Sequence, residues 1–165
     1  MNDTAKRLLK LLESRRGEFS PNNPTLDKFD HSLQCASRAW RAGESADYVV
    51  MCLFHDVFGG FSADQHGVMA GMTLAPYLSD RALHAVSIHV AAMAELRDSA
   101  VVCYDAAGRQ VTAEYPESKE FAEKYDMPSF DPTYDAFELG DFRHLIDQVM
   151  PEDAESEATV TRYAQ

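Results

Sequence analysis

The residues best suited to chemistry in this sequence are its histidines and one adjacent carboxylate. Six histidines lie at positions 31, 55, 66, 84, 89 and 144, and Asp56 directly follows His55. Neighbouring side chains on a helix point about 100° apart, so an adjacent imidazole and carboxylate can serve two metal ions, with the carboxylate as the bridge. These ligand types suit iron, manganese, zinc or nickel. The three cysteines have no CxxC spacing, which argues against a thiolate metal site.

Apolar residues at helical spacing predict the elements that position these side chains. Between residues 27 and 42 they form one stripe, and Gly43 ends that helix. Ser45 can cap the next helix, which runs to the His55-Asp56 doublet before a Gly59-Gly60 breaker. Further helices are expected over residues 65–77, from Ser79 through Met93, from Pro116 to Tyr125 and over residues 142–149. Residues 100–113 suit an irregular stretch or a short hairpin as well as a helix.

Composition and charge are typical of one soluble globular domain. The chain has 165 residues, of which 45% are hydrophobic and 25% charged, so it can bury a proper core. Residues 1–150 are expected to form this domain and residues 151–165 a flexible acidic tail. The formal net charge of -12 disfavours nucleic acid and membranes as partners. The N-terminus lacks a signal-peptide pattern and no long apolar run occurs, which predicts a cytoplasmic protein.

The helical pattern also predicts where individual side chains lie. His31 is opposite the apolar stripe of its helix, which places it either in solvent or against a polar cavity. His89 shares a face with small alanines, so its imidazole is expected to point into the bundle. His84 and His144 are expected at the surface. Three methionines are expected in the core: Met69, Met72 and Met93.

The order and spacing of these residues resemble the HD-domain superfamily. Its pattern is a first histidine, a His-Asp doublet about one helix later and a distant aspartate, and its dinuclear branch adds two histidines between doublet and aspartate. The resemblance implies a compact all-α bundle of about six to seven helices. It also implies a metal pair with six ligands, namely His31, His55, Asp56, His66, His89 and Asp126.

Within that superfamily the sequence is most similar to the HD-domain oxygenases, the group of phosphonate-cleaving diiron dioxygenases and inositol oxygenase. The resemblance covers residues 27–150 and implies a mixed-valent Fe(II)/Fe(III) pair that binds a small-molecule substrate and dioxygen, with manganese or zinc less favoured. Asp56, as the bridge, and Gln34, one turn from His31, are the candidate catalytic residues, Gln34 either contacting substrate or supporting a ligand. Three motifs carry the resemblance: Asp30-His31-Ser32-Leu33-Gln34-Cys35-Ala36, His89-Val90-Ala91-Ala92 and Tyr125-Asp126.

The last ligand has an alternative. Asp131 follows Phe130 in the same aromatic-aspartate arrangement as Tyr125-Asp126. Asp126 is preferred because an ungapped count from the last helix places it at the family position. The segment from Ser129 to Pro132 is then expected to be a capped turn.

Three departures from the phosphonate-cleaving enzymes bear on the substrate. Met93, Gly59 and Glu123 stand where those enzymes have Lys, His and Arg, and residues 43–80 contain no Lys or Arg. The expected function is therefore oxidation of a C-H or C-C bond in a small polar metabolite other than a phosphonate. The alternative is a metal-dependent HD-domain phosphohydrolase, which the scarcity of basic residues near the doublet disfavours. A regulatory domain without turnover is the third interpretation, and a complete ligand set argues against it.

Overall fold

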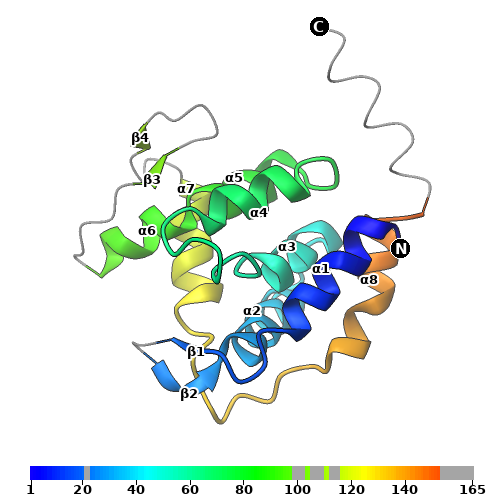
Figure 1. The fold of residues 1–165 in the computed structure, drawn as a ribbon, viewed down its shortest axis with the longest axis horizontal. Coiled ribbons are helices and arrows are strands. Elements are labelled where there is room, and N and C mark those ends of the chain that lie inside the picture. The colour runs from blue at the N-terminus through cyan, green and yellow to red at the C-terminus, as the bar shows by residue number, and fades with distance from the viewer. Residues whose placement is uncertain (21–22, 98–102, 105–109, 112–115, 153–165) are drawn as a thin grey trace, which may run out of the picture.

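Helices account for most of the structure (Figure 1), which confirms the all-α class. The computed structural model describes residues 1–20, 23–97, 103–104, 110–111 and 116–152. Eight α-helices lie among these residues: α1 Asp3–Glu13, α2 Lys28–Arg41, α3 Ala46–Phe54, α4 His66–Leu74, α5 Asp80–Ser87, α6 His89–Leu96, α7 Pro116–Phe121 and α8 Arg143–Val149. A π-helix at Ala122–Asp126 continues α7, and a 3-10 helix at Leu139–Phe142 precedes α8. From residue 153 onward the expected tail lies outside the described residues.

The helix boundaries follow the capping residues of the sequence. Asp27 accepts a hydrogen bond from the amide of Asp30 at 2.8 Å and begins α2. Gly43 has a φ of 80° just after α2, a conformation that favours glycine. Ser45 and Ser79 are the N-caps of α3 and α5, as predicted. The side chains of Asp27 and Ser79 accept the cap hydrogen bonds that begin α2 and α5, whereas Ser45 makes no side-chain cap hydrogen bond.

Two short hairpins accompany the helices. Strands β1 (Phe19–Ser20) and β2 (Asn23–Asp27) pair antiparallel just before α2, a hairpin that the sequence pattern did not predict. Strands β3 (Cys103–Tyr104) and β4 (Gln110–Val111) also pair antiparallel. Within residues 100–113 these two paired strands fit the expected short hairpin, and the rest of that range lies outside the described residues.

The expected single helix from Ser79 through Met93 is two helices, α5 and α6, and α1 is a helix that the sequence pattern did not predict. The break is at Ile88, with φ -127° and ψ 19°. Nδ1 of His89 lies 2.7 Å from the carbonyl oxygen of Val86, which a continuous helix would offer to the amide of Val90. The imidazole thus replaces the backbone donor, and a new helix begins at His89.

Helix α3 is the centre of the core. Every side chain from Tyr48 to Phe54 is buried, and α2, α5 and α8 pack around this helix. The amide of Asn2 donates to the carbonyl oxygen of Met150 at 2.9 Å, so the two ends of the helical bundle meet (Figure 1). No helix among the described residues is long and apolar enough to cross a membrane.

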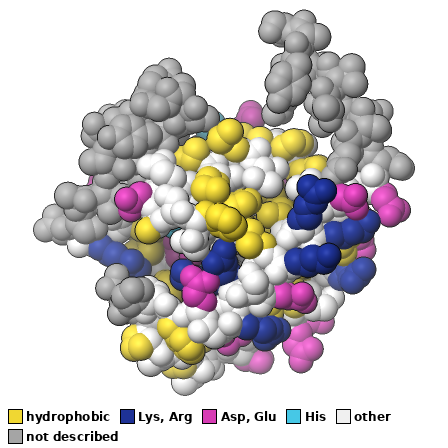
Figure 2. Space-filling model, in the orientation of Figure 1, with side chains coloured by type: hydrophobic (Ala, Val, Ile, Leu, Met, Phe, Trp, Pro, Cys, Tyr) yellow, Lys and Arg dark blue, Asp and Glu magenta, His cyan; other side chains and the backbone are white. Residues whose placement is uncertain are grey.

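The placement of the methionines differs in part from the expectation. Met93 is buried, but Met72 is 63% exposed, which contradicts its predicted place in the core. Met72 lies on the outer side of α4, whose buried residues are Gly67, Ala70, Gly71 and Leu74. Figure 2 shows hydrophobic side chains gathered over α4.

Candidate metal centre

Four imidazoles and two carboxylates from five separate elements converge beside the core. His31 comes from the first turns of α2, and it is buried, so of its two expected surroundings the polar cavity is correct. The other ligand candidates lie at element boundaries: His55 and Asp56 at the end of α3, His66 and His89 as the first residues of α4 and α6, and Asp126 as the last residue of the π-helix. All six predicted ligands are thus brought together.

One group of ligand atoms surrounds His31. Its Nε2 lies 3.2 Å from Nε2 of His55 and 3.3 Å from Oδ1 of Asp126. Oδ2 of Asp56 is 3.7 Å from the same nitrogen. These four residues form the first cluster.

A second group surrounds the other oxygen of Asp56. Its Oδ1 lies 2.8 Å from Nε2 of His66 and 3.4 Å from Nε2 of His89. The two imidazole nitrogens are 3.1 Å apart. Asp56 therefore presents Oδ2 toward His31 and Oδ1 toward His66 and His89, and Oδ1 is also 3.5 Å from Nε2 of His55 in the first cluster. The carboxylate lies between the two clusters, where it could bridge two metals.

The opposite ring nitrogen of every histidine faces a backbone carbonyl. The Nδ1 atoms of His31, His55, His66 and His89 lie 2.9, 2.8, 2.8 and 2.7 Å from the carbonyl oxygens of Ser129, Cys52, Ala63 and Val86. A carbonyl only accepts, so each Nδ1 carries its hydrogen and each Nε2 faces the site. When Nδ1 carries the hydrogen of a neutral ring, its Nε2 presents a lone pair. Two such lone pairs about 3 Å apart repel each other, and a shared proton or a bound metal ion would relieve this repulsion.

The negative charge of the two carboxylates favours the binding of cations in the site. Burial alone would raise the pKa of Asp56, but the surrounding histidines outweigh it and hold that pKa well below its usual range. Burial lowers the pKa of His55 to about 4, so this ring is neutral near pH 7. Burial would also raise the pKa of Asp126, but its hydrogen bond with His31 and the charges of His55 and His31 together outweigh burial and lower that pKa, so Asp126 is likewise ionised. The buried carboxylate of Asp126 and the partly buried carboxylate of Asp56 thus stand among imidazoles whose Nε2 atoms can bind metal ions, with any proton on Nε2 released to solvent.

The spacing of the ligand atoms fits metal coordination. At metal–ligand distances of about 2.1 Å, neighbouring ligand atoms are about 3.0 Å apart at right angles and about 3.4 Å apart in a tetrahedron. The separations of 3.2 and 3.3 Å in the first cluster and 3.1 and 3.4 Å in the second match these values. The described residues therefore contain His/Asp groups that can hold metal ions, in line with the predicted ligand set.

Protein-family models and curated proteins give no significant match to this chain. Its function must be argued from the geometry of the site.

Gln34 lies outside the centre. Its Nε2 donates to the carbonyl oxygen of Asp131 at 2.7 Å, and its Oε1 accepts from the amide of Asp131 at 3.3 Å. Both ends of the amide are occupied, and Gln34 is not among the residues that line the cavity beside the metal ligands. Of its two predicted roles, the contacts support the one in which it holds a ligand in place, through the loop that carries Ser129.

Asp131 itself is not close to the ligand cluster. Its Oδ1 accepts from the amide and the hydroxyl of Thr133 at 2.9 and 2.7 Å, which forms the expected turn. The preceding Phe130 stacks on the ring of His31, with centroids 4.1 Å apart and planes 15° from parallel. The geometry therefore favours Asp126 over Asp131 as the last ligand.

Two further supports were not predicted from the sequence. Phe121 sets its ring edge-on to both His55 and His89, with centroids 5.3 and 5.7 Å away. Arg15 donates through Nε and Nη2 to the carbonyl oxygen of Val57, at 3.2 and 2.9 Å, and so fixes the turn after the doublet. A lone arginine in the first helix gives no sign of this role in the sequence.

The close packing of α4 against His89 leaves no room for a side chain at Gly67. A Cβ at this position would lie 2.8 Å from both Nδ1 of His89 and the carbonyl oxygen of Val86. We expect Gly67→Ala to displace the His89 ring, weaken metal binding by the second cluster and lower the free energy of unfolding by about 1–3 kcal/mol. Metal content and thermal unfolding would measure both effects.

Gly140→Ala is the matched control for Gly67→Ala, because a Cβ at Gly140 would meet nothing within 4 Å. Alanine ordinarily stabilises a helix relative to glycine. A Gly67→Ala protein that is more stable and keeps its full metal content would contradict the packing argument.

A cavity of about 570 Å³ opens onto the ligand cluster. Met93, Gly59, Val90 and Phe130 contribute to its wall, whereas Glu123 is exposed and is not part of the lining. Two cations also line it, Lys28 from α2 and Arg97 just after α6. The absence of Lys and Arg from residues 43–80 therefore does not mean that the cavity lacks positive charge, because these two cations come from outside that range.

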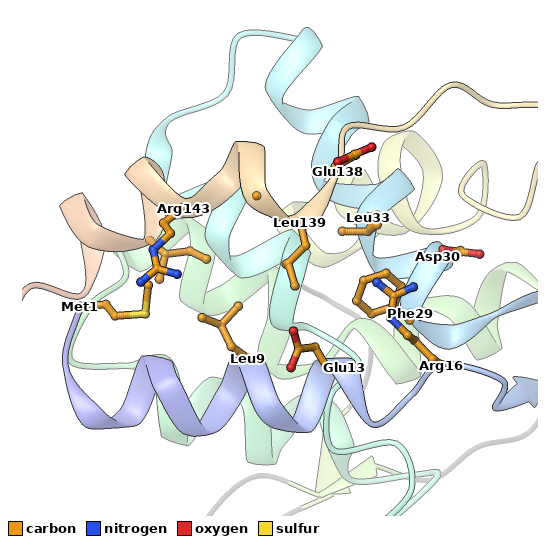
Figure 3. A pocket seen from close by; sticks show the side chains of 12 residues that line it. Met1, Leu9, Glu13, Arg16, Phe29, Asp30, Leu33, Glu138, Leu139 and Arg143 are labelled. Atoms are coloured by element: carbon orange, nitrogen blue, oxygen red, sulfur yellow. The ribbon is translucent and has the colours of Figure 1, made fainter.

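A second cavity, of about 660 Å³, lies on the other side of α2 (Figure 3). Phe29 and Leu33 of the apolar stripe point into it, and Arg16 and Arg143 lie at its rim. None of its lining residues is a candidate metal ligand. Among the described residues, the candidate metal ligands therefore lie beside the smaller of these two cavities.

Proposed function

We propose that this protein is a dinuclear HD-domain oxygenase that uses a mixed-valent iron pair and dioxygen to oxidise a C-H or C-C bond of a small polar metabolite. The observation that carries the proposal is the shared carboxylate of Asp56, with one oxygen toward each of two histidine clusters. Histidine and carboxylate ligands suit iron, which supplies the oxygen chemistry when bound. The all-α fold and the resemblance of the three motifs support the same family.

The residues of the chain would divide the work as follows. His31, His55 and Asp126 would hold one metal, His66 and His89 the other, and Asp56 would bridge them. The backbone carbonyls opposite each imidazole keep Nε2 aimed at the metals, and Phe130 and Phe121 restrain the rings. The apolar wall formed by Val90, Met93 and Phe130 limits water around the substrate.

A phosphohydrolase is the second candidate function. Paired metals can activate water and clamp phosphoryl oxygens, and the cations Lys28 and Arg97 in the cavity favour an anionic substrate. The same six ligands would serve either reaction. Metal identity and the requirement for dioxygen therefore separate the two functions.

The test is to purify the protein without oxygen, measure iron per chain, and record EPR spectra before and after adding candidate substrates. A dinuclear oxygenase is expected to bind iron at both clusters and to give a mixed-valent signal that changes with substrate. Zinc or manganese together with phosphatase turnover would instead establish the hydrolase.

A further inference from the structure

One wall of the metal cavity is a single face of α6. His89, Met93 and Arg97 are four residues apart, so they lie on one side of the helix, and all three line the cavity. At 1.5 Å per residue, Met93 is about 6 Å and Arg97 about 12 Å along the axis from His89. Along this wall the side chains are therefore, in order, a candidate metal ligand (His89), a thioether (Met93) and a guanidinium (Arg97).

The two cations of the cavity differ in their partners. Nζ of Lys28 lies 2.5 Å from Oε1 of Glu18, whose other oxygen is 2.7 Å from Nη1 of Arg15. Among the described residues no carboxylate pairs with Arg97. Arg97 is thus the cation of this cavity that can take an external anion in a two-pronged hydrogen bond.

We propose that Arg97 binds a carboxylate at the far end of an elongated substrate, whose other end reaches the metals. This inference rests on the proposed dinuclear function. The chain between the two ends would lie against Met93, Val90 and Ala94, which offer apolar contact and no charge. A carboxylate, with one charge, matches the guanidinium of Arg97, which pairs with no carboxylate among the described residues, better than a doubly charged phosphonate does, particularly since Asp64 also lines the cavity.

Chain length is the feature that tests this geometry. A short acid such as glycolate can bind only at the metals, whereas 4-hydroxybutyrate can reach from the metals toward Arg97. Calorimetry on the anaerobic iron-loaded protein would compare both acids with the neutral 1,4-butanediol. We expect Arg97→Gln to weaken 4-hydroxybutyrate binding by about 10- to 100-fold, as for loss of a charge-assisted hydrogen bond. Glycolate and butanediol binding should be unchanged.

Three matched variants make the comparison specific. Arg143→Gln removes an arginine at the rim of the other cavity and should leave the binding of all three probes unchanged. Arg97→Lys keeps the charge without the planar fork and should lose only part of the affinity for 4-hydroxybutyrate. Met93→Lys places a cation one turn nearer the metals and should shift the preference toward the shorter acid.

The inference is overturned if Arg97→Gln weakens the acids equally or changes neither. It is also overturned if 3-hydroxypropylphosphonate binds more tightly than 4-hydroxybutyrate through Arg97. Iron content and EPR report separately on the proposed function. Two occupied clusters without Arg97-dependent selectivity would refute only the carboxylate site, and Arg97-dependent binding without a dinuclear centre would refute only the oxygenase.

Discussion

Replacing Asp56 by asparagine is expected to remove both metals at once. Asp56 is the residue whose oxygens reach both clusters, at 2.8 Å from Nε2 of His66 and 3.7 Å from Nε2 of His31. The low pKa of its carboxyl keeps it ionised near pH 7. Asparagine has nearly the same shape but carries no charge and only one oxygen, so it cannot bridge two cations.

Metal content and metal-dependent stability would measure this effect. A ligand that binds only the folded state stabilises it by about 2.7 kcal/mol at a free concentration 100 times its Kd. The thermal midpoint of the wild type should therefore rise on adding iron, whereas that of Asp56→Asn should not. Turnover should be lost together with the metals.

Asp64→Asn is the control for charge. Asp64 lines the same cavity but belongs to none of the groups of ligand atoms that can hold a metal. This variant should keep both metals and their stabilising effect. An Asp56→Asn protein that retains both metals would refute the bridging assignment.

The His55-Asp56 doublet and the helices around it could be predicted from local patterns in the sequence, whereas the full set of six candidate ligands was implied only by the resemblance to HD domains. A His-Asp doublet at the end of an apolar helix stands out, and N-caps such as Ser45 and Ser79 locate the helices around it. The burial of His31 could not be decided in the same way. Its helix carries one apolar stripe, and only the packing of Phe130 and Asp126 against the opposite side buries the imidazole.

What the sequence could not predict depends on contacts between distant segments. The sequence leaves Gln34 either contacting substrate or supporting a ligand, and only its hydrogen bonds with the backbone of Asp131, 97 residues away, favour the supporting role. Lys28 and Arg97 lie outside the neighbourhood of the doublet in sequence and yet line its cavity. The apolar periodicity predicts one helix across Ile88. It cannot show that the imidazole of His89 donates a hydrogen bond to a backbone carbonyl of the preceding turn, which interrupts the helix.

His89→Ala is expected to remove one metal and leave the other. The second cluster would keep only His66 and one oxygen of Asp56, whereas the first cluster would keep all four of its residues. Metal content should therefore fall by half. The mixed-valent EPR signal, which needs both irons, should disappear with nearly all turnover.

His84→Ala provides the matched control, because His84 is an exposed histidine on the neighbouring helix α5. It should keep both metals. His66→Ala should reproduce His89→Ala, since the Nε2 atoms of the two rings are 3.1 Å apart around the same oxygen of Asp56. If His89→Ala instead retained its full metal content, His89 would not be a ligand, and the assignment of the second cluster would be refuted.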